Sequence, residues 1–128
     1  MKSLLIIAHG SRRQASNDEV RELTKRIASK TEQQFDSVQC AFLELAEPSI
    51  PDGIHECVAQ GAKEIVILPY FLSAGRHVAE DIPNEVALTQ PLHPSVNIHI
   101  APYLGSLDTI ADLMAAQAVL IETPIINT

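Results

Sequence analysis

The stretch Glu64-Ile65-Val66-Ile67-Leu68, followed by a loop that carries His77, decides how this chain is expected to fold. A continuous apolar run of this kind is typical of a strand that is covered on both faces. A turn of small residues, Ser73-Ala74-Gly75, follows the run, and Pro83 then suits the first turn of a helix. Ligands bind at the carboxyl ends of the strands in open α/β sheets, so we expect His77 to lie at a binding edge.

Other parts of the chain show the same alternation of strand and helix. Further strands are predicted over residues 2–8, 37–45 and 96–101, and a last helix over residues 106–121. Two more helices are expected to begin at Ser16, which has capping-box spacing to Glu19, and at Ser49. Four successive βα units predict one α/β domain, residues 1–128, with an open parallel four-stranded sheet, flavodoxin-like units and helices on both faces.

The composition excludes several classes of function. Sixteen acidic residues against nine basic ones give a formal charge of −7, which argues against a nucleic-acid binder with its basic face. The chain has no run of about 18 apolar residues, which a membrane span needs, and its apolar N-terminal segment is too short for a signal peptide. We therefore expect a cytoplasmic protein that binds neither nucleic acid nor membrane, with Cys40 and Cys57 as buried, reduced thiols.

Two histidines and a glutamate are predicted to lie along one edge of the sheet. His9 directly follows the first strand, Glu44 lies near the end of the second, and His77 follows the third. Neutral imidazole nitrogens suit Co, Ni, Fe or Zn, so His9 and His77 are interpreted as a metal pair. Glu44 would be a third ligand or a general base. The alternative is that each residue is an ordinary polar side chain that ends a strand and points to water.

Three arginines give this acidic chain a local cationic edge beside the two histidines. The candidate substrate-binding residues are Ser11, Arg12, Arg13, Ser73, Gly75 and Arg76. Guanidinium groups suit carboxylates or phosphates, while the serines and the glycine offer hydroxyl and backbone donors. The alternative is that the arginines are solvated and paired with Glu80 or Asp81.

The three remaining histidines are given no chemical role. His55 falls within a predicted helix and His93 precedes Pro94 in a loop, so both are interpreted as surface residues. His99 lies on the fourth strand, where polar and apolar residues alternate, and could face a partner subunit.

Taken together, these motifs resemble the CbiX family of class II sirohydrochlorin chelatases, related to SirB and CbiK. The matching segments are Ala8-His9-Gly10-Ser11-Arg12, Ala41-Phe42-Leu43-Glu44 with Pro48-Ser49, and residues 69–78 with Asp81-Ile82-Pro83. They occur in the order that the family has, and the resemblance spans roughly residues 3–105. The third segment is the most specific of them.

The resemblance implies a chelatase that inserts a divalent metal into sirohydrochlorin for cobalamin, sirohaem or coenzyme F430 synthesis. The metal would be Co²⁺ most often, and Fe²⁺ or Ni²⁺ in some members; it is a substrate, and no cofactor would be permanently bound. By the same resemblance, His9 and His77 would hold the metal and Glu44 would assist. We add that the arginines would steer and seat the carboxylates of the macrocycle.

The resemblance also implies a partner, because many class II chelatases have two such lobes in one chain and the short members form homodimers. We therefore expect a homodimer with the macrocycle between its subunits, using either one shared site or two. The sequence leaves open which metal is used and which pathway is served. The alternative function is a non-catalytic carrier of metal or tetrapyrrole, which would use His9 and His77 without depending on Glu44.

Overall fold

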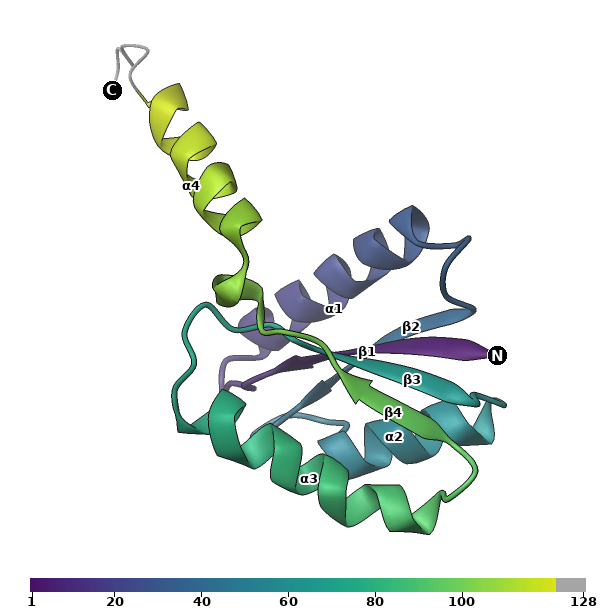
Figure 1. The fold of residues 1–128 in the computed structure, drawn as a ribbon. Helices are drawn as coiled ribbons and strands as arrows, with labels where there is room; N and C mark the ends of the chain where they lie inside the picture. Colours follow the sequence, from purple (N-terminus) through teal and green to yellow (C-terminus); the bar gives the residue numbers. More distant parts are fainter. Residues whose placement is uncertain (122–128) are drawn as a thin grey trace.

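Four parallel strands form the centre of the molecule, and helices lie on both faces of the sheet (Figure 1). The computed structural model describes residues 1–121. The strands are β1 (Lys2–Ala8), β2 (Ser37–Phe42), β3 (Glu64–Pro69) and β4 (Asn97–Ile100). They lie in the order β2-β1-β3-β4, and every neighbouring pair is parallel. The predicted α/β fold, with an open parallel four-stranded sheet, is confirmed.

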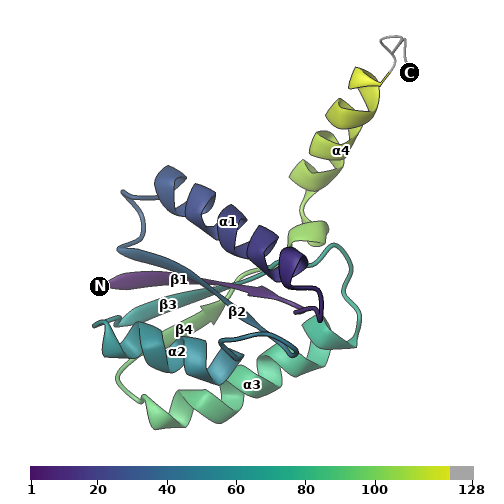
Figure 2. The same cartoon turned by 180° about the vertical axis from the view of Figure 1, so that it is seen from behind.

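The helices form two unequal layers around the sheet. On one side lies α1 (Gln14–Lys30), and on the other lie α2 (Ile50–Ala59) and α3 (Ile82–Thr89), as Figures 1 and 2 show. A last helix, α4 (Asp108–Leu120), projects away from both layers. Short helical turns complete the chain: η1 (His77–Asp81), η2 (Gln90–Leu92) and η3 (Leu104–Ser106). None of the helices within residues 1–121 has both the length and the apolar character that crossing a bilayer requires.

The core lies mainly between the sheet and the α2/α3 layer. Leu5 and Ile7 of β1 and Ile65 and Ile67 of β3 are fully buried there, packed with Ile54 of α2. Because side chains alternate across a strand, Leu4 and Ile6 point to the opposite face, toward α1. Burial on both faces explains why β1 reads as a continuous apolar run. The core fixes the strands whose carboxyl ends carry the candidate site.

The start of α1 differs from the prediction. The helix begins at Gln14, two residues before Ser16, and Arg13 occupies the N-cap position without a side-chain hydrogen bond. The cause is Asn17, which is 3% exposed: its amide accepts from the backbone N–H of Ser11 (2.9 Å) and donates to the Ser11 carbonyl (2.8 Å). The Asn17 side chain therefore lies in the first turns of α1 and hydrogen-bonds the loop that precedes the helix.

The other predicted helix start is confirmed, and two boundaries shift. The Ser49 hydroxyl caps α2 by accepting from the backbone N–H of Asp52 (3.2 Å). Strand β2 ends at Phe42 rather than at residue 45, so Glu44 lies in the connection beyond the strand. The C-terminal helix was predicted over residues 106–121 and occupies Asp108–Leu120 after the η3 turn.

Candidate metal centre

The carboxyl ends of β1, β2 and β3 bring His9, Glu44 and His77 together. One potential ligand atom from each residue lies within 4.8 Å of the other two. The two imidazole rings meet edge to face, with their centroids 4.7 Å apart. The juxtaposition that the sequence predicts is therefore present, although residues 9, 44 and 77 come from three separate βα connections.

Glu44 reaches His9 because the chain continues the β1–β2 pairing past the end of β2. The backbone N–H of Leu43 donates to Ala8 O (3.0 Å), and that of Glu44 donates to His9 O (3.1 Å). Gly10 makes this approach possible: its φ is +95°, and a Cβ at this position would lie 1.7 Å from the Glu44 carbonyl oxygen. Only glycine fits there. Leu45 then takes a left-handed φ of 64° as the connection turns.

The hydrogen bonds of His9 leave its Nε2 facing a carboxylate. Nδ1 lies 2.9 Å from the carbonyl oxygen of Gly10, which can only accept, so Nδ1 carries the hydrogen. In the neutral ring, Nε2 then holds a lone pair, yet it lies 3.1 Å from Oε2 of Glu44. Two electron-pair donors at this separation can share a cation. Together with His77, the pair offers ligand atoms for a metal ion.

His77 is also bound through Nδ1, but to a carboxylate and not to a backbone carbonyl. Its Nδ1 lies 2.7 Å from Oδ2 of Asp81, one helical turn further along η1. An ionised carboxylate only accepts, so Nδ1 donates and Nε2 remains free for a ligand. A histidine that is bound to a carboxylate through one nitrogen and to a metal through the other is a common arrangement in metalloproteins.

The three donors are spaced for a metal ion that is held loosely. Donor atoms that all lie about 2.1 Å from one ion can be at most about 4.2 Å apart. The limit of 4.8 Å within which these donors lie is slightly wider, and a small side-chain movement closes the difference. The His9, Glu44 and His77 side chains are 44, 52 and 44% exposed, so the centre is open to solvent. Such a site can take up an ion and release it again.

Carboxylates surround the centre and give it a local negative field. A depression of about 350 Å³ is lined by Leu43, Glu44, His77, Asp81, Asn84 and Glu85. A second hollow of about 240 Å³ is lined by His9 and reaches Ser11, Asn17 and Tyr70. Three carboxylates beside two imidazoles attract divalent cations.

The predicted substrate-binding residues occupy two loops at the same rim. Ser11, Arg12 and Arg13 follow His9, while Ser73, Gly75 and Arg76 precede His77, and the contact of the two imidazoles holds the loops together. Arg12, Arg13 and Arg76 are exposed, and Arg76 lies 3.7 Å from Glu80. The Ser11 hydroxyl accepts from the backbone N–H of Arg13 (3.0 Å) and can still donate. Their role toward a substrate stays a prediction.

Three positioning residues were not identified from the sequence. Asp81 was interpreted only as a partner for an arginine, whereas it binds His77; the spacing of four residues within one helical segment would have indicated this. Asn17 ties down the loop after His9. Gly105 of η3 fits against the His77 loop, since a Cβ there would lie 1.8 Å from Leu72 O. No local sequence signal marks the last two.

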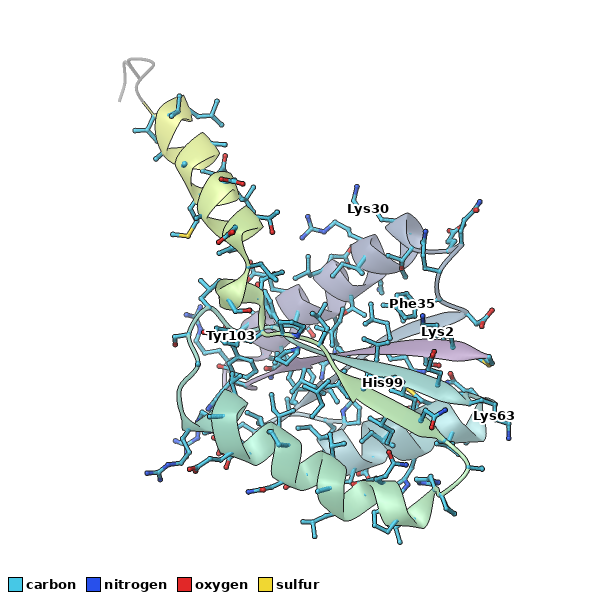
Figure 3. The ribbon with its side chains drawn as sticks, viewed as in Figure 1. Lys2, Lys30, Phe35, Lys63, His99 and Tyr103 are labelled. Atoms are coloured by element: carbon cyan, nitrogen blue, oxygen red, sulfur yellow. The ribbon has the colours of Figure 1, made fainter. Side chains whose placement is uncertain are left out.

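The interpretation of His55 and His93 as surface residues is only partly right. Both are half-buried, and the two rings contact each other edge to face at 4.7 Å between centroids, linking α2 to the segment after η2. His99 is exposed on the edge strand β4 (Figure 3). All three lie outside the group formed by His9, Glu44 and His77.

Comparisons with known proteins agree with this arrangement. The chain is 39% identical over 111 residues to a chloroplastic sirohydrochlorin ferrochelatase of Arabidopsis thaliana; the match covers 87% of this chain and 48% of the relative. A CbiX protein from Marinobacter aquaeolei superposes with a TM-score of 0.74 at 26% identity, covering 95% of this chain and 96% of that one. The sirohydrochlorin chelatase SirB of Bacillus subtilis subspecies spizizenii, solved in complex with cobalt, gives 0.75 at 29% identity, covering 94% and 50%.

The curated relatives are longer than this chain. The chain spans 48 to 64% of the length of the first three curated relatives, so their activities belong to longer proteins. The family assignment does not depend on that length, because the CbiX family model matches residues 3–119, nearly the whole of the chain. The chain belongs to the CbiX family.

Proposed function

We propose that this chain inserts a divalent metal ion, Co²⁺ first and Fe²⁺ or Ni²⁺ as alternatives, into sirohydrochlorin. One observation carries the proposal: His9 Nε2 and the Glu44 carboxylate lie beside His77 at an open rim, and both imidazoles are bound through Nδ1 to acceptors. Relatives named sirohydrochlorin ferrochelatase and cobaltochelatase support the choice of macrocycle. We further propose the cytoplasm as its location, which suits the two free cysteines.

The proposed reaction exchanges two protons for one metal ion. Both pyrrole N–H groups of the macrocycle must lose their protons while the metal leaves the protein, so the products are the metallated macrocycle and two protons. His9 and His77 would hold the ion, and few protein ligands leave open positions for the macrocycle nitrogens. The Glu44 carboxylate would take a proton as a general base, and the open rim passes protons on to solvent.

The exposed arginines would seat the substrate. The net charge of −7 repels an anionic macrocycle at long range, so attraction has to be local. Arg12, Arg13 and Arg76 lie on the loops that flank the two histidines, and Ser11, Ser73 and Gly75 would add neutral donors. We propose a homodimer whose subunits face each other across the macrocycle. This chain matches 50% of the SirB chain, so SirB is about twice as long. That length supports an arrangement in which two copies of this chain form the two lobes around one cleft.

The test is absorbance against time for the purified chain with sirohydrochlorin and excess Co²⁺. We expect insertion well above the protein-free rate, and expect His9→Ala or His77→Ala to abolish the gain. His99→Ala is the matched control, because it removes an exposed imidazole from the edge strand β4, outside the group formed by His9, Glu44 and His77. Stoichiometric binding of metal or macrocycle at only the spontaneous rate would show a carrier and overturn the proposal.

A further inference from the structure

Two histidines outside the candidate metal centre face each other where α2 meets the segment after η2. His55 Nδ1 lies 2.5 Å from His93 Nε2, and the two rings meet edge to face with their centroids 4.7 Å apart. Both residues are half-buried, and 38 positions of sequence separate them. The fold therefore brings together two imidazole nitrogens that the proposed metal insertion does not use.

The backbone on both sides of this contact is firmly held. On α2, His55 follows directly after Ile54, which is fully buried in the core. The turn at His93 is closed by its own backbone: the His93 N–H donates to Gln90 O (3.0 Å), and the His93 carbonyl accepts from the Val96 N–H (3.1 Å). The side-chain amide of Gln90 also donates to the carbonyls of His93 (3.2 Å) and Val96 (2.7 Å). Side chains that project from backbone held in this way are pre-organised as ligands.

Neither ring is committed to one tautomer. In the part of the chain that the structure describes, the only side-chain hydrogen bond of either ring is the one between them. This differs from His9 and His77, whose Nδ1 atoms are bound to acceptors. Each of the two rings can therefore carry its hydrogen on the outer nitrogen, His55 Nε2 and His93 Nδ1. In that state the two inner nitrogens present their lone pairs to each other, and a cation between them can bind both.

The spacing of the two inner nitrogens is close to that of a metal-bound pair. Imidazole nitrogens that each lie about 2.1 Å from one ion are about 3.0 Å apart at a right angle and about 3.4 Å apart at a tetrahedral angle. The present distance is 2.5 Å, so the rings need to separate by less than about 1 Å to admit an ion. Small rotations of two half-buried side chains provide this separation. Two protein ligands leave the remaining positions of the ion to water.

We propose that His55 and His93 form a second metal site, which binds one borderline divalent ion such as Ni²⁺, Cu²⁺ or Zn²⁺ through one nitrogen of each ring. Imidazole suits these ions, whereas Mg²⁺ and Ca²⁺ take oxygen ligands. Asp52 lies one turn before His55 on α2, and its exposed carboxylate adds negative charge on the same side of the helix. The pair takes no part in metal insertion, so this site goes beyond the proposed function.

The second site is separate from the centre formed by His9, Glu44 and His77. The segments η1, α3 and η2 follow one another without a break from His77 to Leu92, so His77 and His93 lie at opposite ends of this stretch (Figure 1). A helical stretch of this length spans roughly 20 Å, too far for one ion to contact both ends. Removal of the ligands at the first centre therefore leaves the second pair in place, and the second site can be measured alone.

An ion at this site would fasten α2 to the segment that leads into β4. Because 38 positions of sequence separate the two ligands, the unfolded chain does not hold them in place for one ion. An ion that binds the folded chain and not the unfolded chain stabilises the fold by mass action. A rise in melting temperature that needs both imidazoles is therefore the signature of the site, and an ion bound to one exposed histidine would not give it.

Isothermal titration calorimetry with Ni²⁺ tests the site on the tag-free full chain that carries His9→Ala and His77→Ala. We expect one Ni²⁺ to bind per chain, and expect His55→Ala or His93→Ala in the same background to weaken this binding by about tenfold or more. His99→Ala is the matched control, because it removes an exposed imidazole from β4 and should leave the binding unchanged. No Ni²⁺ binding in the starting chain, or binding that the His55 and His93 substitutions leave unchanged, would overturn the proposal.

Thermal unfolding of the same chains covers the case in which a substitution itself weakens the fold. Each melting temperature is measured without metal and with Ni²⁺, so that only the shift caused by the ion is compared. We expect Ni²⁺ to raise the melting temperature of the starting chain by several degrees, and expect no such shift with His55→Ala or with the polar replacement His93→Gln. Equal shifts in all chains would contradict the site. Neither measurement uses metal insertion, so this site and the proposed function can fail independently of each other.

Discussion

Oδ2 of Asp81 lies 2.7 Å from Nδ1 of His77, one turn further along the same helical segment. The carboxylate holds the imidazole through Nδ1 and leaves Nε2 free for a ligand, and it adds negative charge beside the ring. The neighbouring Glu80 has a different partner, Arg76, at 3.7 Å. The consecutive residues Glu80 and Asp81 therefore contact different side chains, and mutating each in turn gives a matched comparison.

Removing the Asp81 carboxylate should weaken the metal centre without unfolding the chain. We expect Asp81→Ala to lower metal affinity or the rate of insertion about 10- to 100-fold, the usual loss when the carboxylate behind a metal-bound histidine is removed. Titration with Co²⁺ and the insertion assay measure the two quantities. Glu80→Ala should change either by less than about twofold. Equal effects of the two substitutions would mean that Asp81 does not act through His77.

Gly10 should be indispensable for stability, in contrast to Gly75. A Cβ at Gly10 would lie 1.7 Å from Glu44 O at a φ of +95°, whereas a Cβ at Gly75 meets no atom within 4 Å. We expect Gly10→Ala to reduce the free energy of unfolding by about 2 kcal/mol or more, from strain and displacement of the Glu44 connection. Gly75→Ala should change it by less than about 1 kcal/mol. Thermal unfolding of both variants checks this; similar melting temperatures would contradict it.

The fold was predictable because its signals are local and repeated. The apolar runs that became β1 and β3 alternate with helical patterns, and that alternation alone implies a parallel sheet. Parallel strands place their carboxyl ends on one edge, which is why the sequence alone groups His9, Glu44 and His77.

The missed features depend on contacts between distant segments. The two hydrogen bonds of Asn17 to Ser11 moved the start of α1 to Gln14, although the Ser16 to Glu19 spacing is a sound capping signal on its own. The fit of Gly105 against Leu72 likewise joins segments that are separated in sequence. The outward course of α4 could not be inferred, since an apolar helical pattern does not say which surface covers it.

Glu44 should matter for proton removal more than for metal binding. Glu44→Gln keeps an oxygen ligand near His9 Nε2 but removes the base. We expect the insertion rate to fall by roughly 10² to 10⁴, the range of general-base contributions, while the dissociation constant for Co²⁺ changes far less. Glu47→Gln, which alters an exposed acid three residues away, should have no such effect. An unchanged insertion rate in Glu44→Gln would exclude Glu44 as the base.

The two thiols should differ sharply in reactivity. Burial raises the pKa of Cys57 to about 11 from its ordinary 9.0, with the charge of nearby Glu56 adding to the rise, while Cys40 is only half-buried. Because the thiolate is the reactive form, native protein at pH 8 should be alkylated by iodoacetamide at Cys40 and spared at Cys57. Mass spectrometry measures the labels: Cys40→Ser should take none when native and one in denaturant. Native labelling of both cysteines at similar rates would contradict the prediction.

The raised pKa of Cys57 also makes stability depend on pH. Since the pKa is higher in the folded state, the protonated Cys57 contributes stability below about pH 9 that is lost progressively toward pH 11.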